Sequence, residues 1–96
     1  MYLSIYRFDG DTDELLAAYD RMTEMIPPAN IDFHACVVRD DGITVFDACP
    51  DEETAVAFQS GPQFRGTLEA VGLPWPRIES AGEIHRARVL GGQVVA

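Results

Sequence analysis

The chain contains no lysine, and its seven basic residues face 16 aspartate and glutamate residues. The resulting formal net charge is −9. Nucleic acids and anionic membrane surfaces are bound chiefly through clusters of lysine and arginine. The composition therefore argues against nucleic acid and against membranes as partners.

Cysteine is scarce too, since two cysteines in 96 residues are too few for a disulfide scaffold. Reduced thiols in a cytoplasmic protein are the simpler interpretation. No apolar run approaches the roughly 20 residues needed to cross a bilayer. The first residues follow a strand pattern, so no secretory leader is expected. We therefore expect a cytoplasmic protein.

What is present is typical of one globular domain over residues 1–96, with 47% hydrophobic and 24% charged residues. A domain of this size buries only roughly 60–65% of the surface that its unfolded chain exposes. A homodimer would add burial that a single chain lacks.

Residues 31–49, IDFHACVVRDDGITVFDAC, organise the rest of the chain. They predict two strands joined by a tight turn. Asp41-Gly42 is a strong hairpin signal, because a type I′ turn needs positive φ at both central residues. We therefore expect these two residues to form the loop.

The length of this turn decides which side chains are neighbours. A two-residue loop at 41–42 places Cys36 opposite Asp47, whereas a four-residue loop over 39–42 places His34 there. A three-residue loop would separate His34 from Asp47. Both even lengths give the same two faces, because side chains alternate along a strand. One face holds His34, Cys36, Val38, Val45, Asp47 and Cys49, and the other holds Phe33, Ala35, Val37, Phe46 and Ala48.

Before the hairpin, residues 2–8 alternate like a strand, with hydroxyl-bearing and aromatic side chains on one face. A helix follows, with Asp11 as its cap, Glu14 completing a box-like start, and Pro27-Pro28 ending it. Its apolar side chains recur at helical spacing. They are Leu15, Tyr19, Met22 and Ile26.

After the hairpin, Pro50 and three acidic residues predict the start of a second helix. Gly61-Pro62 should break this helix into two pieces. A last strand is expected within residues 77–89, with a bulge or bend at Gly82. The final residues, 93–96, form a short tail that is either disordered or paired with another chain.

The predicted order is strand, helix, two strands, helix, strand. This is the α+β, ferredoxin-like split β-α-β arrangement, a four-stranded antiparallel sheet with both helices on one face. The other face would be bare and apolar. A second copy of the same sheet is the simplest cover, so we expect a homodimer.

Several short segments resemble those of the dimeric α+β barrel superfamily, and within it small proteins of the antibiotic biosynthesis monooxygenase type. They are His34, DGITVFD at 41–47, DEETA at 51–55 with Phe58, Gly72-Leu73-Pro74 and Ile84-His85. The resemblance implies sheets that meet in a barrel and a ligand cavity between each sheet and its helices. It also implies activities that range from cofactor-independent monooxygenation and polyketide cyclisation to none known. Cys49 stands where such proteins usually carry an aromatic residue, and the Asn-and-Trp signature of haem-degrading members is not recognisable.

His34 and Asp47 are the first candidate catalytic residues. A carboxylate that contacts an imidazole fixes its tautomer and raises its basicity, as a base for phenols, quinols or carbon acids requires. The alternative is a buried histidine that Asp47 merely compensates. His85 is the third candidate, because the resemblance implies that this end of the last strand can reach the partner subunit. Its alternative is a surface or interface histidine.

Five further residues are candidates for the wall of a ligand pocket. They are Tyr6, Tyr19, Cys36, Cys49 and Trp75. Trp75 lies between two prolines and could equally plug the helix packing. The two cysteines with His34 and Asp47 contain every ligand type of a zinc site, but no C-x₂-C turn is present and flat strands converge poorly. No metal and no organic cofactor are expected.

Two functions follow from these residues. The first is a cofactor-independent monooxygenase-like or cyclase-like enzyme that acts on an aromatic or polyketide-like compound. The second is a non-catalytic ligand-binding or stress-response protein of the same fold.

Overall fold

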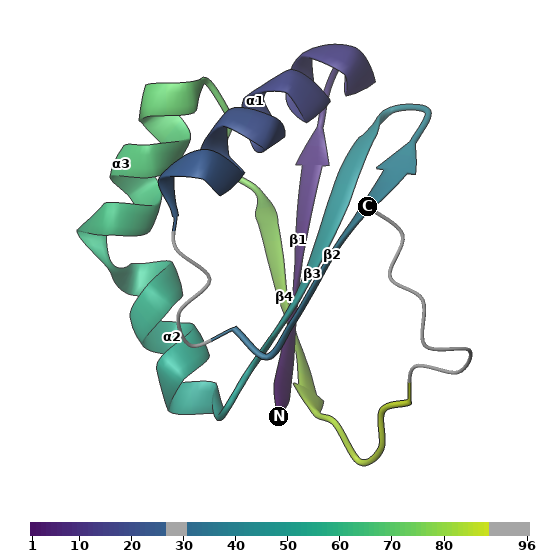
Figure 1. The fold of residues 1–96 in the computed structure, drawn as a ribbon, viewed down its shortest axis with the longest axis vertical. Helices are drawn as coiled ribbons and strands as arrows, with labels where there is room; N and C mark the ends of the chain where they lie inside the picture. Colours follow the sequence, from purple (N-terminus) through teal and green to yellow (C-terminus); the bar gives the residue numbers. More distant parts are fainter. Residues whose placement is uncertain (27–30, 89–96) are drawn as a thin grey trace.

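The computed structural model describes residues 1–26 and 31–88 as one four-stranded sheet and three helices (Figure 1). In chain order these are β1 (Tyr2–Asp9), α1 (Thr12–Met25), β2 (Phe33–Arg39), β3 (Gly42–Cys49), α2 (Glu52–Ser60), α3 (Pro62–Val71) and β4 (Arg77–Glu83). The predicted tail at 93–96 and the prolines at 27 and 28 lie outside the described residues. No described helix is long and apolar enough to cross a membrane.

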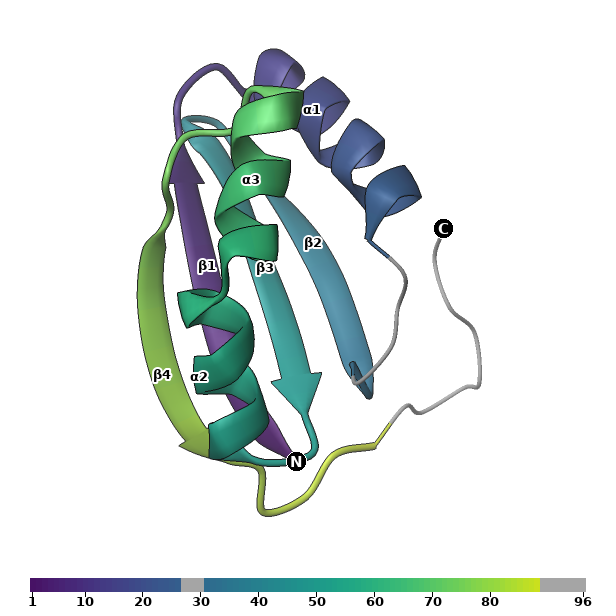
Figure 2. The same cartoon turned by 90° about the vertical axis from the view of Figure 1, so that its left-hand side faces the viewer.

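The sheet has the strand order β2-β3-β1-β4, and every neighbouring pair is antiparallel. The three helices lie on one face of it, as Figures 1 and 2 show from two directions. The predicted antiparallel sheet and the pairing of the last strand with the first are confirmed. The arrangement is consistent with a ferredoxin-like fold.

The helix boundaries follow the signals in the sequence. Asp11 caps α1 by accepting a hydrogen bond from the Glu14 N–H at 3.0 Å, and Asp51 caps α2 in the same way. Gly61 is extended, with φ −76° and ψ 151°, and Pro62 begins α3. Because proline cannot donate the hydrogen bond that would continue α2, the predicted break occurs here.

The hairpin has a different turn from the one expected. Arg39 pairs with Gly42, so Asp40 and Asp41 form the turn, and the expectation of an Asp41-Gly42 loop is wrong. Gly42 is instead the first residue of β3. There it pairs with Asp9, and its backbone lies close to the backbone of Phe8 at the end of β1. The observed register is the alternative that places His34 opposite Asp47, so the two predicted faces are retained.

The predicted irregularity in the last strand is confirmed. Leu3 pairs with Gly82 while Ser4 pairs with Ser80, which leaves Ala81 as the extra residue of a bulge. Gly82 has a φ of 134°, a conformation that glycine adopts without strain. The strand ends at Glu83 and is therefore shorter than the segment 77–89 in which it was expected.

The main core lies between the sheet and the helices. Its buried side chains include Phe8, Ile43, Leu15, Phe64 and Leu68. No described helix covers the opposite face, where the side chains of β2 are only partly enclosed. Phe33 is 45% exposed and Val37 is 46% exposed on that face.

Candidate functional site

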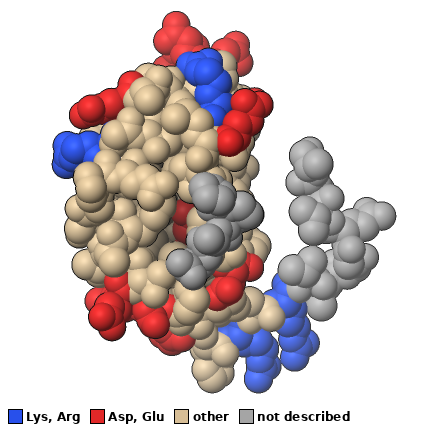
Figure 3. All heavy atoms as spheres, turned by 60° about the vertical axis from the view of Figure 1, so that its left-hand side comes forward, with Lys and Arg blue, Asp and Glu red and all other residues tan. Residues whose placement is uncertain are grey.

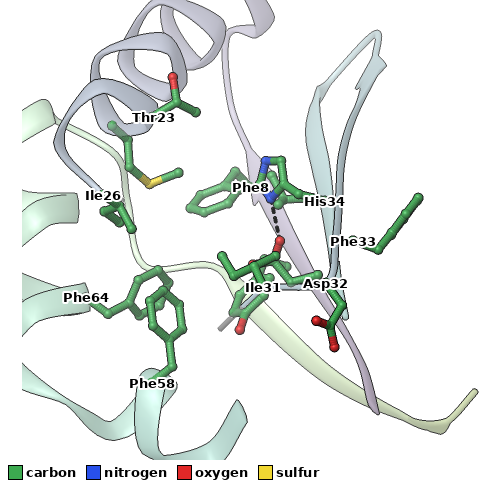
Figure 4. Close-up of a pocket in the computed structure, with 13 residues that line it drawn as sticks. Phe8, Thr23, Ile26, Ile31, Asp32, Phe33, His34, Phe58 and Phe64 are labelled. Atoms are coloured by element: carbon green, nitrogen blue, oxygen red, sulfur yellow. Dashed lines mark hydrogen bonds and ion pairs between the residues drawn. The ribbon is translucent and has the colours of Figure 1, made fainter. Parts of the chain in front are cut away.

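A cavity of about 320 Å³ lies between the sheet and the helices (Figure 4). Most of its wall is apolar and includes Phe8, Met22, Ile26, Phe58 and Phe64. His34 and Asp47 line one side of the cavity. The structure therefore brings together the first two candidate catalytic residues in a mostly apolar space.

The two strands of the hairpin position this pair. His34 in β2 is directly opposite Asp47 in β3, and the His34 Nδ1 is hydrogen-bonded to Asp47 Oδ1. The Asp47 side chain is only 9% exposed, whereas that of His34 is 33% exposed. An ionised carboxylate can only accept, so Nδ1 carries the hydrogen in this bond.

Tyr19 completes the arrangement from helix α1. Its hydroxyl is hydrogen-bonded to His34 Nε2, and the two rings lie nearly parallel at 8° with their centroids 5.8 Å apart. Burial raises the pKa of Tyr19 to about 12, with smaller contributions from nearby negative groups that include Asp47. The phenol therefore keeps its proton at neutral pH and donates it to Nε2.

Both ring nitrogens of His34 are thus occupied. The imidazole can take a proton from a ligand when the hydroxyl of that ligand replaces the hydroxyl of Tyr19 at Nε2. Tyr19 was predicted as a wall residue, and it contacts the site through His34 without lining the cavity itself. Its helical spacing in the apolar stripe of α1 gave no sign of this polar contact.

A second set of polar contacts involves β1, the strand that pairs with β3. The Gln59 side-chain amide donates to Ser4 Oγ at 3.1 Å and to Tyr6 Oη at 3.2 Å. Tyr6 lines the cavity, as predicted, and is 3% exposed. Burial raises its pKa to about 12, although the hydrogen bond from Gln59 opposes the shift. Gln59 was missed, and the only signal was the excess of hydroxyl groups on one face of β1.

The two cysteines are free thiols and lie in different parts of the structure. Cys36 is half-buried and packs against the main core, whereas Cys49 is buried and lines a second cavity. Burial raises the pKa of both thiols, so neither is activated as a nucleophile. Within residues 1–26 and 31–88, no three His, Cys, Asp or Glu side chains are placed to hold a metal ion.

The remaining two candidates lie away from the cavity. Trp75 is 48% exposed, packs edge-on against Phe64 and has the Arg65 guanidinium 4.5 Å from its ring. This placement fits the alternative of a plug over the helix packing. His85 is exposed, follows the end of β4, and within one chain lines neither cavity. Its approach from a partner subunit stays a prediction.

The second cavity, of about 490 Å³, adjoins the first and was not predicted. The two share Ile31, Asp47 and Phe58 in their walls. The second also contains Asp51 and Glu53 at the start of α2. Asp47 therefore lies where an apolar cavity meets an acidic one.

Comparison with known proteins assigns no family. No family matches the chain, and no curated protein matches it significantly. The resemblance to the dimeric α+β barrel superfamily thus rests on the residue pattern, and the α+β sheet with helices on one face is compatible with it.

Proposed function

We propose that this chain binds an aromatic or polyketide-like molecule as a homodimeric α+β barrel protein and acts on it without a cofactor. The observation that supports this best is the hydrogen bond between the buried carboxylate of Asp47 and the partly exposed imidazole of His34, in the wall of an otherwise apolar cavity. Ligand sites are typically apolar clefts of roughly 300–1,000 Å³ with a few placed polar groups. At about 320 Å³, this cavity suits a molecule of one or two fused rings.

His34 is the base in this proposal. A ligand hydroxyl or activated C–H gives its proton to Nε2, and Asp47 stabilises the imidazolium that results. The ligand becomes a phenolate or an enolate. An enolate can attack a carbonyl of the same molecule, as in cyclisation, and an electron-rich phenolate can react with dioxygen, as in monooxygenation. Tyr19 and Tyr6 are hydroxyl donors close to the charge that develops.

One observation favours the second function, binding without turnover. Tyr19 already occupies the His34 Nε2, so the pair is hydrogen-bonded without any ligand. In that case the three side chains fix β2 to α1, and the cavity holds a ligand that is not converted. The two functions differ in what removal of His34 does.

Replacing His34 with alanine distinguishes them. With a quinol, an anthrone or a short polyketide as substrate, we expect turnover to fall by about 10²–10⁴-fold, the usual contribution of a general base. Binding measured by calorimetry should change by less than about threefold. His85→Ala is the matched histidine variant, and a loss of turnover there would support its predicted approach from the partner.

The outcomes separate the alternatives. Binding with no turnover that depends on His34 would support the non-catalytic function. Failure of every such compound to bind would contradict both. Circular dichroism of each variant checks that the fold is kept.

The proposed dimer has its own test on the uncovered face of the sheet. A second copy that covers this face would bury Val37, which is 46% exposed in the single chain, so Val37→Glu should weaken dimerisation by at least about tenfold. Val56 on α2 is similarly exposed, at 47%, and Val56→Glu should leave the dimer unchanged. Sedimentation velocity gives the oligomeric state, and a wild-type chain that is monomeric at high concentration would rule out the dimer.

A further inference from the structure

One carboxylate oxygen of Asp47 is hydrogen-bonded to His34, and the other is available to a ligand. Its Oδ1 is hydrogen-bonded to His34 Nδ1, and the part of the chain that the structure describes gives Oδ2 no hydrogen bond. The side chain is 9% exposed and contributes to the walls of both cavities. Within the described residues, Oδ2 is not among the buried side-chain atoms that lack a partner, so it is accessible and can accept a hydrogen bond from a ligand that supplies a donor.

Around Asp47, the other carboxylates in the walls of the two cavities add further negative charge. Asp32 belongs to the wall of the first cavity, and Asp51 and Glu53 belong to the wall of the second. Among the described residues that line the two cavities, none is lysine or arginine. Figure 3 shows acidic atoms inside a hollow whose visible surroundings are mainly uncharged. An anion that entered this space would meet repulsion from these carboxylates, and no lysine or arginine in the described walls would offset it.

We propose that this site selects ring compounds that carry an amine or hydroxyl donor for Asp47 and rejects those that carry a carboxylate. The inference rests on the proposed function, because it concerns the ligand of the same cavity. The ring packs among apolar side chains such as Ile26, Phe58 and Phe64. Its donor group bonds Asp47 Oδ2 and extends toward the acidic second cavity.

The sign of the charge decides the preference. An ammonium and a carboxylate both lose hydration when they enter the cavity, so desolvation disfavours both. Only the ammonium regains a charge-assisted hydrogen bond to Asp47, a bond roughly twice as strong as a neutral one. A hydroxyl loses less hydration and gains a weaker bond. The expected order of affinity is amine, then alcohol, then carboxylate.

The test uses three probes with the same ring: naphthylmethylamine, naphthylmethanol and naphthoate. Binding to the full chain at neutral pH is followed by NMR chemical-shift changes, which also show whether the signals of Phe58 and Phe64 respond. We expect the amine to bind at least about tenfold more tightly than the carboxylate, which corresponds to about 1.4 kcal/mol. In Asp47→Asn the two affinities should come within about threefold of each other.

Asp13→Asn is the matched control. It removes one carboxylate from the exposed first turn of α1, so it changes the net charge equally without touching either cavity. The preference should remain in this variant. If Asp47→Asn does not fold, Glu53→Gln in the second cavity should reduce the preference for the amine about twofold.

Two results would overturn the inference. The first is that naphthoate binds the wild-type cavity as tightly as the amine does. This result would contradict the selectivity and leave the proposed binding function intact. The second is a preference for the amine that persists in Asp47→Asn at full size. If none of the three probes perturbs the cavity, the proposed binding function fails as well.

Discussion

An alanine at Gly42 is expected to lower the free energy of unfolding by about 3 kcal/mol or more, a loss that reflects backbone strain combined with a steric clash. Gly42 has a φ of 155°, and a Cβ there would lie 2.0 Å from the backbone oxygen of Phe8 and 3.0 Å from the Arg39 guanidinium. The side chain of Arg39 could move aside. The carbonyl of Phe8 cannot, because Gly42 pairs with Asp9 on one side and with Arg39 on the other.

Two other glycines separate the causes of this loss. Gly66 lies inside α3 with nothing within 4 Å of an added Cβ, so Gly66→Ala should stabilise the helix by roughly 0.5–1 kcal/mol. Gly72 has a φ of 86° but open space around it, so Gly72→Ala should cost roughly 1–2 kcal/mol from backbone strain alone. Urea denaturation of the three variants measures the differences. Equal stability of Gly42→Ala and wild type would mean that the strands do not meet as described.

The error in the hairpin turn shows what local signals omit. Asp41-Gly42 is a strong turn pattern, yet this glycine is required by a contact with β1, which is more than 30 residues away in the chain. A turn signal read from neighbours alone cannot distinguish these two reasons for glycine. Alternation was more reliable, because both even loop lengths leave the same side chains on each face. For this reason the pairing of His34 with Asp47 could be anticipated.

The contacts from the helices could not be anticipated in the same way. Tyr19 meets His34 and Gln59 meets Tyr6 because of the rotation of α1 and α2 about their axes. The apolar stripe of a helix defines that rotation only to within about one residue position. His85 illustrates another limit. The strand that was expected to carry it ends at Glu83, shortly after the bulge at Ala81, so the side chain of His85 is not aligned by the sheet.

Raising the pH from 10 to 12 is expected to lower the free energy of unfolding by about 2 kcal/mol through Tyr6. Burial raises the pKa of this phenol from its ordinary value of 10.0 to about 12 in the folded chain. Between these two values the unfolded chain loses the proton while the folded chain keeps it. The unfolded state is then favoured, so the stability present below pH 10 is lost as the pH rises. The shift in Tyr19 acts in the same direction.

The variant Tyr6→Phe isolates this contribution. Below pH 9 it should be less stable than wild type by about 1 kcal/mol, because Gln59 loses one hydrogen-bond acceptor. Between pH 10 and 12 its unfolding free energy should fall by about 2 kcal/mol less than that of wild type. The two stability curves should therefore cross at alkaline pH. Urea denaturation at several pH values measures the crossing, and parallel curves would show that the Tyr6 phenol is not shielded from water. Because Tyr6 and Asp47 both line the cavity, such a result would also mean that the cavity is more open than its apolar wall implies.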